Sequence, residues 1–377
     1  MFEAPTEWIS PESFPDLKDH KYIAIDLETR DPDLKSRGSG SIIGNGEIVG
    51  ISVAVEGWSG YYSFGHAEGN FFDKEVVMRW IKEVCALPNV KLFHNAMYDV
   101  CWLRAYGVKI NGHIVDTMVM ASLIDENRFH YSLNSLSIDY LGQVKDETAL
   151  RAAAERAGVD AKAEMWKLPA MYVGLYAEKD AELTLSLFKK LSVEIKKQDL
   201  TKVFDLETQL FPCLIDMKFK GVRVDVQKAH TIKQKLAAQE ESLLLEVKKE
   251  TGIEPQIWAA RSIAKVFDKL GLNYVRTAKT QAPSFTKNFL QEHKNPIVNK
   301  IAKAREINKA HTTFIDTIIK YEHRGRIHAD INPIRGDSGG TVTGRFSYSN
   351  PNLQQIPARN KQIGPMIRSL FIPEENH

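Results

Sequence analysis

Acidic residues in the first half of the chain have types and spacings that suit metal chemistry. Asp26 and Glu28 are one residue apart in an apolar segment with β-strand character, Lys21–Thr29. Side chains two positions apart on a strand share a face, so both carboxylates would project together while Ile25 and Leu27 point into a core. Adjacent carboxylates repel each other, and a divalent cation between them removes that cost. The pair alone does not identify a metal site, because most such pairs are solvated strand ends.

Two further motifs place acids on expected helices. Asp99 lies four residues after Asn95 and would fall in the first turn of a helix, where the helix dipole favours an anion. Tyr176 and Asp180 are also four residues apart and would share one face of a helix over Ala170–Lys197. Taken singly, these motifs are equally explained by an ordinary helix acid and by a tyrosine packed beside a salt-bridged aspartate.

The three motifs in order form a more specific pattern. The pattern resembles the DEDD 3′–5′ exonuclease superfamily in its order: D-x-E on a strand, then N-x-x-x-D, then Y-x-x-x-D. The tyrosine of the third motif resembles the one that distinguishes the DEDDy branch of that superfamily. That branch includes the RNase D group and the proofreading domains of family A DNA polymerases. The flanking Thr29 and Asn95 fit the same pattern, and we expect both to contact a single-stranded 3′ end of DNA.

The resemblance also implies a mechanism. Two divalent cations, Mg²⁺ or Mn²⁺, roughly 4 Å apart would clamp the attacking and leaving oxygens of a phosphodiester. Hard oxygen ligands suit these ions. By the family's pattern the metal ligands are Asp26, Glu28, Asp99 and Asp180. Tyr176 would orient the attacking water together with Glu28.

A second motif lies near the end of the chain. Residues 342–357 read V-T-G-R-F-S-Y-S-N-P-N-L-Q-Q-I-P and resemble the T-G-R-x-S-S-x-x-P-N-L-Q-x-I-P signature at the thumb–palm junction of family A (Pol I-type) DNA polymerases. The resemblance implies that Arg345 lies by the minor groove of a primer–template duplex, where contacts carry little sequence information. The alternative is a polar turn without a ligand. Further candidate DNA contacts are Thr343, Asn350, Gln354 and Arg359.

The family's later palm and fingers motifs do not occur in these 377 residues. We therefore expect a metal-dependent 3′–5′ exonuclease and no DNA polymerase activity from this chain alone. The chain would be the proofreading portion of a split or truncated polymerase, partnered by a separate C-terminal polymerase chain. One alternative is a non-polymerising DNA-binding half that complements such a chain. Another, an RNase D-like RNA exonuclease, explains only residues 20–200.

Composition sets broad limits. The net charge is +2, so bulk charge does not indicate a nucleic-acid-binding protein, although the residues from 301 onward are more basic than the rest. The three cysteines, Cys85, Cys101 and Cys213, have no metal-site spacing and fit a reducing compartment. No run of about 18 apolar residues occurs, so we expect no membrane span and a cytoplasmic protein.

Alternating strand and helix patterns in the first 200 residues predict an α/β domain with a mixed sheet. Its family resemblance implies an RNase H-like fold. Asp73 and Asp116 each precede an apolar helix and could cap it; Asp116 could instead be a fifth acid near the site. The predicted strands are Lys21–Thr29, Glu47–Val55, Ser59–Phe64, Lys91–Asn95 and Ile114–Asp116.

Helical patterns dominate after residue 200. Val226–Thr251 is either a short coiled coil or, as we favour, one helix of an antiparallel arm. Gly336–Thr343 and Ser347–Pro351 have turn composition, and Met366–Pro373 should belong to an unfinished palm sheet with an exposed apolar surface. The other long helices are Thr201–Lys220 and Asn295–Arg324. The expected domains are an N-terminal extension (1–20), exonuclease (21–200), a mainly helical thumb region (201–330), and thumb–palm junction with an incomplete palm (331–377).

Overall fold

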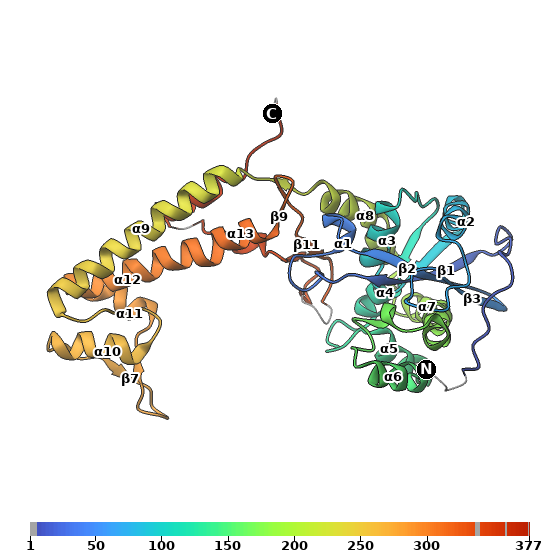
Figure 1. The fold of residues 1–377 in the computed structure, drawn as a ribbon, viewed down its shortest axis with the longest axis horizontal. Coiled ribbons are helices and arrows are strands. Elements are labelled where there is room, and N and C mark those ends of the chain that lie inside the picture. The colour runs from blue at the N-terminus through green and yellow to red at the C-terminus, as the bar shows by residue number, and fades with distance from the viewer. Residues whose placement is uncertain (1–5, 336–339, 359, 376) are drawn as a thin grey trace. The chain divides into compact units, whose positions relative to one another are not determined.

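The computed structural model describes residues 6–335, 340–358, 360–375 and 377 (Figure 1). The chain forms two compact units. The first comprises Met1–Gly221 and His328–Asn350, and the second comprises Val222–Ile327 and Pro351–His377. Arg359 and residues 336–339 of the predicted Gly336–Thr343 loop lie outside the described residues.

A five-stranded mixed sheet is the centre of the first unit, with strand order β3-β2-β1-β4-β5. The first three strands are antiparallel, and β4 and β5 run parallel to β1. The predicted α/β fold with a mixed sheet is thus confirmed, although β4 ends at Phe93 rather than Asn95. The strands are β1 (Tyr22–Arg30), β2 (Glu47–Val55), β3 (Trp58–Ser63), β4 (Val90–Phe93) and β5 (Ile114–Asp116).

Helices cover both faces of this sheet (Figure 1). On one face, α2 (Lys74–Ala86) and α3 (Ala96–Ala105) pack in a core with the odd-numbered residues Ile23, Ile25 and Leu27 of β1. The other face contains Ala24 and is covered by α4 (Thr117–Ile124), α5 (Leu133–Leu141) and α7 (Ala170–Lys197). Because side chains alternate along a strand, the even-numbered acids of β1 face α7.

The segment before β1 is anchored on α7. Trp8 is buried, and its Nε1 donates to Glu178 Oε1 at 2.9 Å. Gly174 makes room for the indole, since a Cβ there would lie 2.1 Å from Trp8 Cδ2. The segment around Trp8 therefore helps to hold the helix that carries Tyr176 and Asp180.

The first unit also contains α1 (Gly40–Ile43), α6 (Thr148–Ala157), the 3₁₀ turn η1 (Met165–Lys167), the long helix α8 (Thr201–Lys220), β11 (Asp330–Asn332) and β12 (Ser347–Ser349). The prediction of a loop over Ser347–Pro351 is wrong for its first three residues. They pair as β12 with β11, a partner far away in the sequence that turn composition does not reveal.

The second unit is mainly helical. Figure 1 shows α9 (Val226–Thr251) alongside α12 (Pro296–Lys309) and α13 (Asp316–Tyr321), which run back in the opposite direction. This confirms the antiparallel arm. The predicted helix Asn295–Arg324 is interrupted by a π-helix, η2 (Ala310–Ile315), and ends at Tyr321. Across the described residues of both units, no helix is long and apolar enough to cross a membrane.

Small elements close the second unit. A core around Phe267 joins α9, α10 (Ala260–Lys269), α11 (Lys287–Glu292) and α12. The remaining elements are short strands, one 3₁₀ turn and one helix: β6 (Val222–Arg223), β7 (Val275–Arg276), β8 (Pro283–Ser284), β9 (Glu322–His323), β10 (Arg326–Ile327), η3 (Leu353–Gln355) and α14 (Ile363–Arg368).

The prediction for Met366–Pro373 is wrong for its first three residues. Residues up to Arg368 belong to α14, whereas residues 370–372 pair with residues 223–225 through a β-bridge between Phe371 and Val224 and backbone hydrogen bonds on either side of it. Ile367 and Leu370 are fully buried in the second unit, so this segment does not present the exposed apolar surface we expected. Helix formation lets the apolar side chains turn inward without a completed sheet.

Candidate active site

Three of the predicted metal ligands meet on the α7 side of the central sheet. Asp26 and Glu28 come from β1 and Asp180 from α7, and each can offer one oxygen such that all three atoms lie within 4.8 Å of one another. Glu28 and Asp180 are buried, and Asp26 is half-buried. Strand alternation aligns the first two acids, and the packing of α7 on β1 brings in the third.

This arrangement is electrostatically costly for the protein alone. Burial, followed by repulsion from Asp180, raises the pKa of Asp26 well above its usual range. Burial and then Asp26 do the same to the pKa of Glu28. Clustered carboxylate oxygens with surplus negative charge are the donor set that Mg²⁺ and Mn²⁺ prefer, so these residues fit a divalent cation.

Asp99 lies beside this cluster. It is buried in the first turn of α3, and its Oδ1 accepts a hydrogen bond from the Leu27 backbone N–H at 3.1 Å. Burial and the nearby Asp26 raise the pKa of Asp99 well above its usual range. The structure therefore places the fourth predicted acid next to β1, outside the set of three whose oxygens converge within 4.8 Å.

Asp116 fixes the start of two helices. Its Oδ1 accepts from the backbone N–H groups of Met118 at 2.8 Å and Asn95 at 3.0 Å, and its Oδ2 accepts from Ala96 at 2.9 Å. The predicted capping role is confirmed for α4, and Asp116 also holds the start of α3. Burial raises the pKa of Asp116 to about 6, against the opposing effect of these hydrogen bonds. Asp116 thus positions Asp99 through α3.

Tyr176 lies one helical turn before Asp180 on α7. Burial raises the pKa of Asp180, and the Lys145 ammonium and then the Tyr176 hydroxyl oppose that shift. Burial, and then the charge of Asp180, strongly raises the pKa of Tyr176. The phenol therefore stays protonated at neutral pH and can donate a hydrogen bond near the acids.

Lys145 is the residue of this site that the sequence patterns did not indicate. Its ammonium pairs with Asp180 Oδ1 and lies 3.9 Å from the centroid of the Tyr176 ring. The side chain is only 4% exposed, although it comes from the loop between α5 and α6. A lone lysine in a segment without periodicity gives no sequence signal, and only the fold brings it to the acids.

The two predicted contacts for a single-stranded 3′ end differ in their surroundings. Thr29 Oγ1 is hydrogen-bonded to the Tyr98 hydroxyl at 2.6 Å, and that hydroxyl donates to Asp31 Oδ2 at 3.2 Å. Asn95 is exposed at the start of α3, with φ of 66° in the left-handed region. Thr29 is therefore part of an internal network, whereas Asn95 has a solvent-facing side chain.

Family models match both units in sequence. The model described as "3'-5' exonuclease" matches residues 10–196, and the model described as "DNA polymerase family A" matches residues 226–377. The chain belongs to the family A DNA polymerases. The acid cluster lies in the part of this family A chain that matches the exonuclease model.

Two relatives are similar to this chain in sequence, and one solved structure is similar to it in fold. A DNA-directed DNA polymerase of Pseudomonas phage M6 is 32% identical over 98% of this chain and 58% of its own length. A DNA polymerase I of Synechocystis is 28% identical over 87% of this chain and 33% of its own length. The chain thus spans less than two thirds of these relatives. The POL domain of Pol1 from M. smegmatis, solved with DNA primer-template and dNTP, has the same fold (TM-score 0.70, 19% identity, 95% of this chain and 56% of that one).

The predicted junction residues of this family A chain are mostly exposed. Thr343 and Arg345 are exposed in the first unit, and Gln354 is exposed in the second. The Arg345 carbonyl accepts from Thr341 Oγ1 at 2.7 Å, which closes the turn. Asn350 is half-buried and donates from Nδ2 to Asp330 Oδ2 at 3.0 Å.

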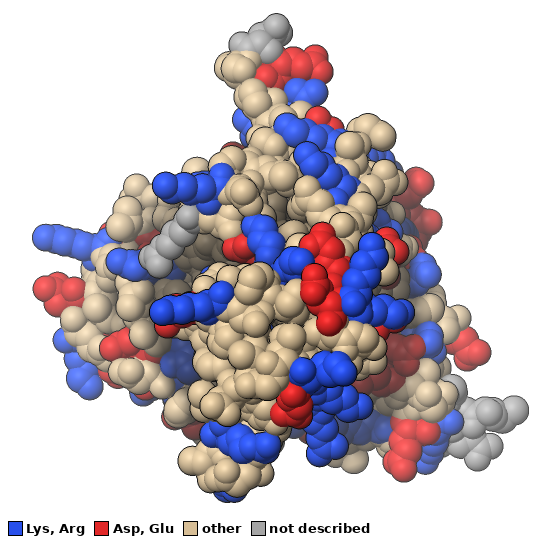
Figure 2. Space-filling view, turned by 90° about the vertical axis from the view of Figure 1, so that its left-hand side faces the viewer, with Lys and Arg blue, Asp and Glu red and all other residues tan. Residues whose placement is uncertain are grey.

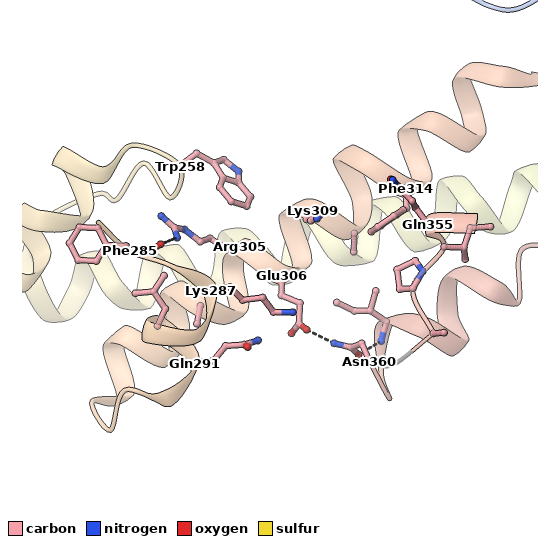
Figure 3. Close-up of a pocket in the computed structure, with 17 residues that line it drawn as sticks. Trp258, Phe285, Lys287, Gln291, Arg305, Glu306, Lys309, Phe314, Gln355 and Asn360 are labelled. Carbon is pink, nitrogen blue, oxygen red and sulfur yellow. Dashed lines mark hydrogen bonds between the residues drawn. The ribbon is translucent and has the colours of Figure 1, made fainter. Parts of the chain in front are cut away.

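The polymerase-family segment also contains a cavity of about 680 Å³ (Figure 3). Arg305 is part of its wall and donates to the carbonyls of Ile257 at 2.6 Å and Phe285 at 2.7 Å. Asn360 closes another side through a hydrogen bond to Glu306. Two N–H groups of Arg305 are thus held by backbone carbonyls, and the side chain braces the wall of the cavity.

The surface charge in this view does not point to one particular binding region. Figure 2 shows Lys and Arg side chains in several groups on one face, with Asp and Glu between them. Exposed pairs of opposite charge contribute little to stability. The buried acids are therefore the part of the molecule with the most specific chemistry.

Proposed function

We propose that the chain is a metal-dependent 3′–5′ DNA exonuclease, the proofreading portion of a family A DNA polymerase. The observation that carries this proposal is the convergence of Asp26, Glu28 and Asp180 within 4.8 Å, in the segment that matches the 3′–5′ exonuclease model. We assign residues 21–200 to the exonuclease, 201–330 to the thumb, and 331–377 to the junction and start of the palm.

The roles of the side chains follow from their surroundings. Divalent cations bound here would stabilise the negative charge that develops on the phosphoryl and leaving oxygens. Asp26, Glu28 and Asp180 would hold the first ion, and Asp99 would help to hold a second. Tyr176 would orient the attacking water by a hydrogen bond, because its raised pKa opposes proton removal by the phenol. Glu28 would accept a proton of that water.

DNA is the proposed partner at two places. A single-stranded 3′ end would reach the acids past Asn95 and Thr29, and a primer–template duplex would contact Thr343, Arg345, Asn350, Gln354 and Arg359. The solved relative from M. smegmatis contains primer-template DNA, which supports duplex binding. We place the activity in the cytoplasm.

The test is release of the terminal nucleotide from a 3′-labelled single-stranded DNA in Mg²⁺. Wild-type protein should release it and Asp26→Ala should not. Asp73→Ala removes an exposed helix cap away from the acids and serves as the control. Equal, slow release by wild type and Asp26→Ala would refute the proposal. Faster cleavage of an RNA oligomer would favour the RNase D-like alternative.

Polymerisation is a separate proposal. The chain matches only 58% of the length of the phage M6 polymerase, and the palm and fingers motifs do not occur in its sequence. We propose that nucleotide incorporation requires a polypeptide that carries the segment of that relative which this chain does not span. Adding that polypeptide should produce incorporation on a primed template, and no gain on mixing would argue against the partnership.

A further inference from the structure

Lys145 has an unusual position for a charged residue. Its side chain is buried, whereas the apolar Val144 beside it is 71% exposed. The reverse is the normal preference, since lysine is almost never buried without a partner. The loop therefore turns its charged residue inward and leaves its apolar one in water.

The partner of Lys145 is one of the proposed metal ligands. Its Nζ pairs with Asp180 Oδ1 and lies over the Tyr176 ring, so it is within the cluster formed with Asp26 and Glu28. The Lys145 charge opposes the effect of burial on all three acids. A single ammonium compensates one of the three negative charges, and the others remain uncompensated.

The loop that carries Lys145 is fixed at both ends. Gly142 closes α5 in the left-handed conformation (φ 65°), with its N–H bonded to the Ile138 carbonyl. Glu147 precedes α6 and pairs with Lys162, Nζ to Oε1 at 3.0 Å, and with Arg151. The ammonium is thus tethered at the acids by a short loop with anchors on both sides.

We propose that Lys145 is a tethered counter-ion that stabilises the acid cluster without metal and competes with a divalent cation for Asp180. This inference rests on the proposed metal-dependent function. Like charges repel, so an ammonium inside the cluster weakens cation binding and sets the metal concentration at which the site fills. Without the ammonium, the three acids repel each other more strongly in the metal-free protein.

The test compares Lys145→Met with wild type in the full chain. Manganese affinity, measured by titration calorimetry, should tighten by about tenfold or more when the ammonium is removed, as expected for a change of roughly 1.4 kcal/mol. In EDTA the variant should unfold at a lower temperature than wild type, and saturating Mn²⁺ should close the gap. Lys189→Met is the matched control, because it removes an ammonium from the helix that carries Asp180, but Lys189 pairs with the exposed Glu56 rather than with an acid of the cluster. Its affinity should stay within about twofold of wild type.

Other results would overturn the inference. Unchanged or weaker Mn²⁺ binding by folded Lys145→Met would show that the lysine does not compete with metal. Should that variant not fold in EDTA, the double variant Lys145→Met, Asp180→Asn should recover folding, because the uncompensated charge is removed with the lysine. Failure of this rescue would contradict the counter-ion role. Absence of Mn²⁺ binding by wild type would instead refute the proposed function and this inference together.

Discussion

The acid cluster and the junction segment differ in how the protein holds its polar groups. The acids are buried or half-buried on β1, α3 and α7, and each is surrounded by packed elements. In the predicted junction segment, residues 331–377, Arg345 lies exposed on a loop and Gln354 lies exposed in η3. One region holds a few oxygens close together at an electrostatic cost, whereas the other offers side chains that are already solvated.

The difference teaches which functions require preorganisation. A metal ion needs several oxygens at fixed separations. The carboxylates repel one another before the ion binds, and their attraction to the bound ion then outweighs that repulsion. Contact with a DNA backbone depends on charges that adapt to the duplex, and its strength depends on salt. We therefore expect mutations in the cluster to have large effects on chemistry and stability, and mutations in the junction to have small effects on affinity.

The largest expected effect follows removal of a cluster carboxylate. Asp26→Ala should lower the rate of 3′-nucleotide release on the order of a thousandfold, because the electrostatic stabilisation of the developing charge is lost. Arg345→Ala should leave the single-strand rate within about twofold. Single-turnover hydrolysis measures both, and comparable losses in the two variants would remove the distinction between the regions.

The Tyr176→Phe variant tests whether the Tyr176 hydroxyl orients the attacking water or helps to bind the metal. Loss of the hydroxyl should lower kcat by about tenfold to a hundredfold, while Mn²⁺ affinity stays near the wild-type value because no carboxylate is removed. Steady-state kinetics and calorimetry check the two quantities. A matching loss of metal affinity would show that the phenol instead organises the carboxylates.

Asp116→Ala should destabilise the fold more than an ordinary cap substitution. Asp116 accepts from N–H groups at the starts of α3 and α4, so we expect a loss of about 2 kcal/mol, against about 1 kcal/mol for Asp73→Ala at a single helix. Urea denaturation gives both values. Equal losses of stability would mean that the hydrogen bonds from Asp116 to the start of α3 do not stabilise the fold.

Metal-free stability should depend on pH through the cluster. Raised pKa values mean that the folded state binds these protons more tightly than the unfolded state, where Asp and Glu titrate near 3.8 and 4.5. That stabilisation is present below about pH 4 and is lost as pH rises through the folded pKa values. In EDTA, the Tm of Asp26→Asn should therefore rise relative to that of wild type by a few degrees as the pH goes from about 5 to about 7. A constant Tm difference would indicate that Asp26 is not perturbed.

The smallest expected effect concerns the junction. Arg345→Ala should weaken binding to a primer–template duplex by about tenfold or less and reduce the slope of log K against log salt by about one. Fluorescence anisotropy at several salt concentrations measures both. Unchanged affinity and an unchanged slope would show that Arg345 does not contact the duplex.

The sequence predicted the regular elements well where one local period controls them. β2, α7, α8 and α9 have the predicted bounds, because strand alternation and helical periodicity are local signals. The acid motifs could be found for the same reason. The pairing of β12 with β11 and the inward turn of Lys145 could not, because each depends on a partner distant in the sequence. The helix at Ile363–Arg368 was not predicted, because the family resemblance led us to expect that Met366–Pro373 belongs to a palm sheet.

The acid cluster as a metal site is the central claim, and one measurement tests it directly. Crystals of the chain soaked in Mn²⁺ should show an anomalous-difference peak within about 2.5 Å of oxygens from Asp26, Glu28 and Asp180. A map without a peak at these carboxylates, or with manganese bound only elsewhere, would contradict the account.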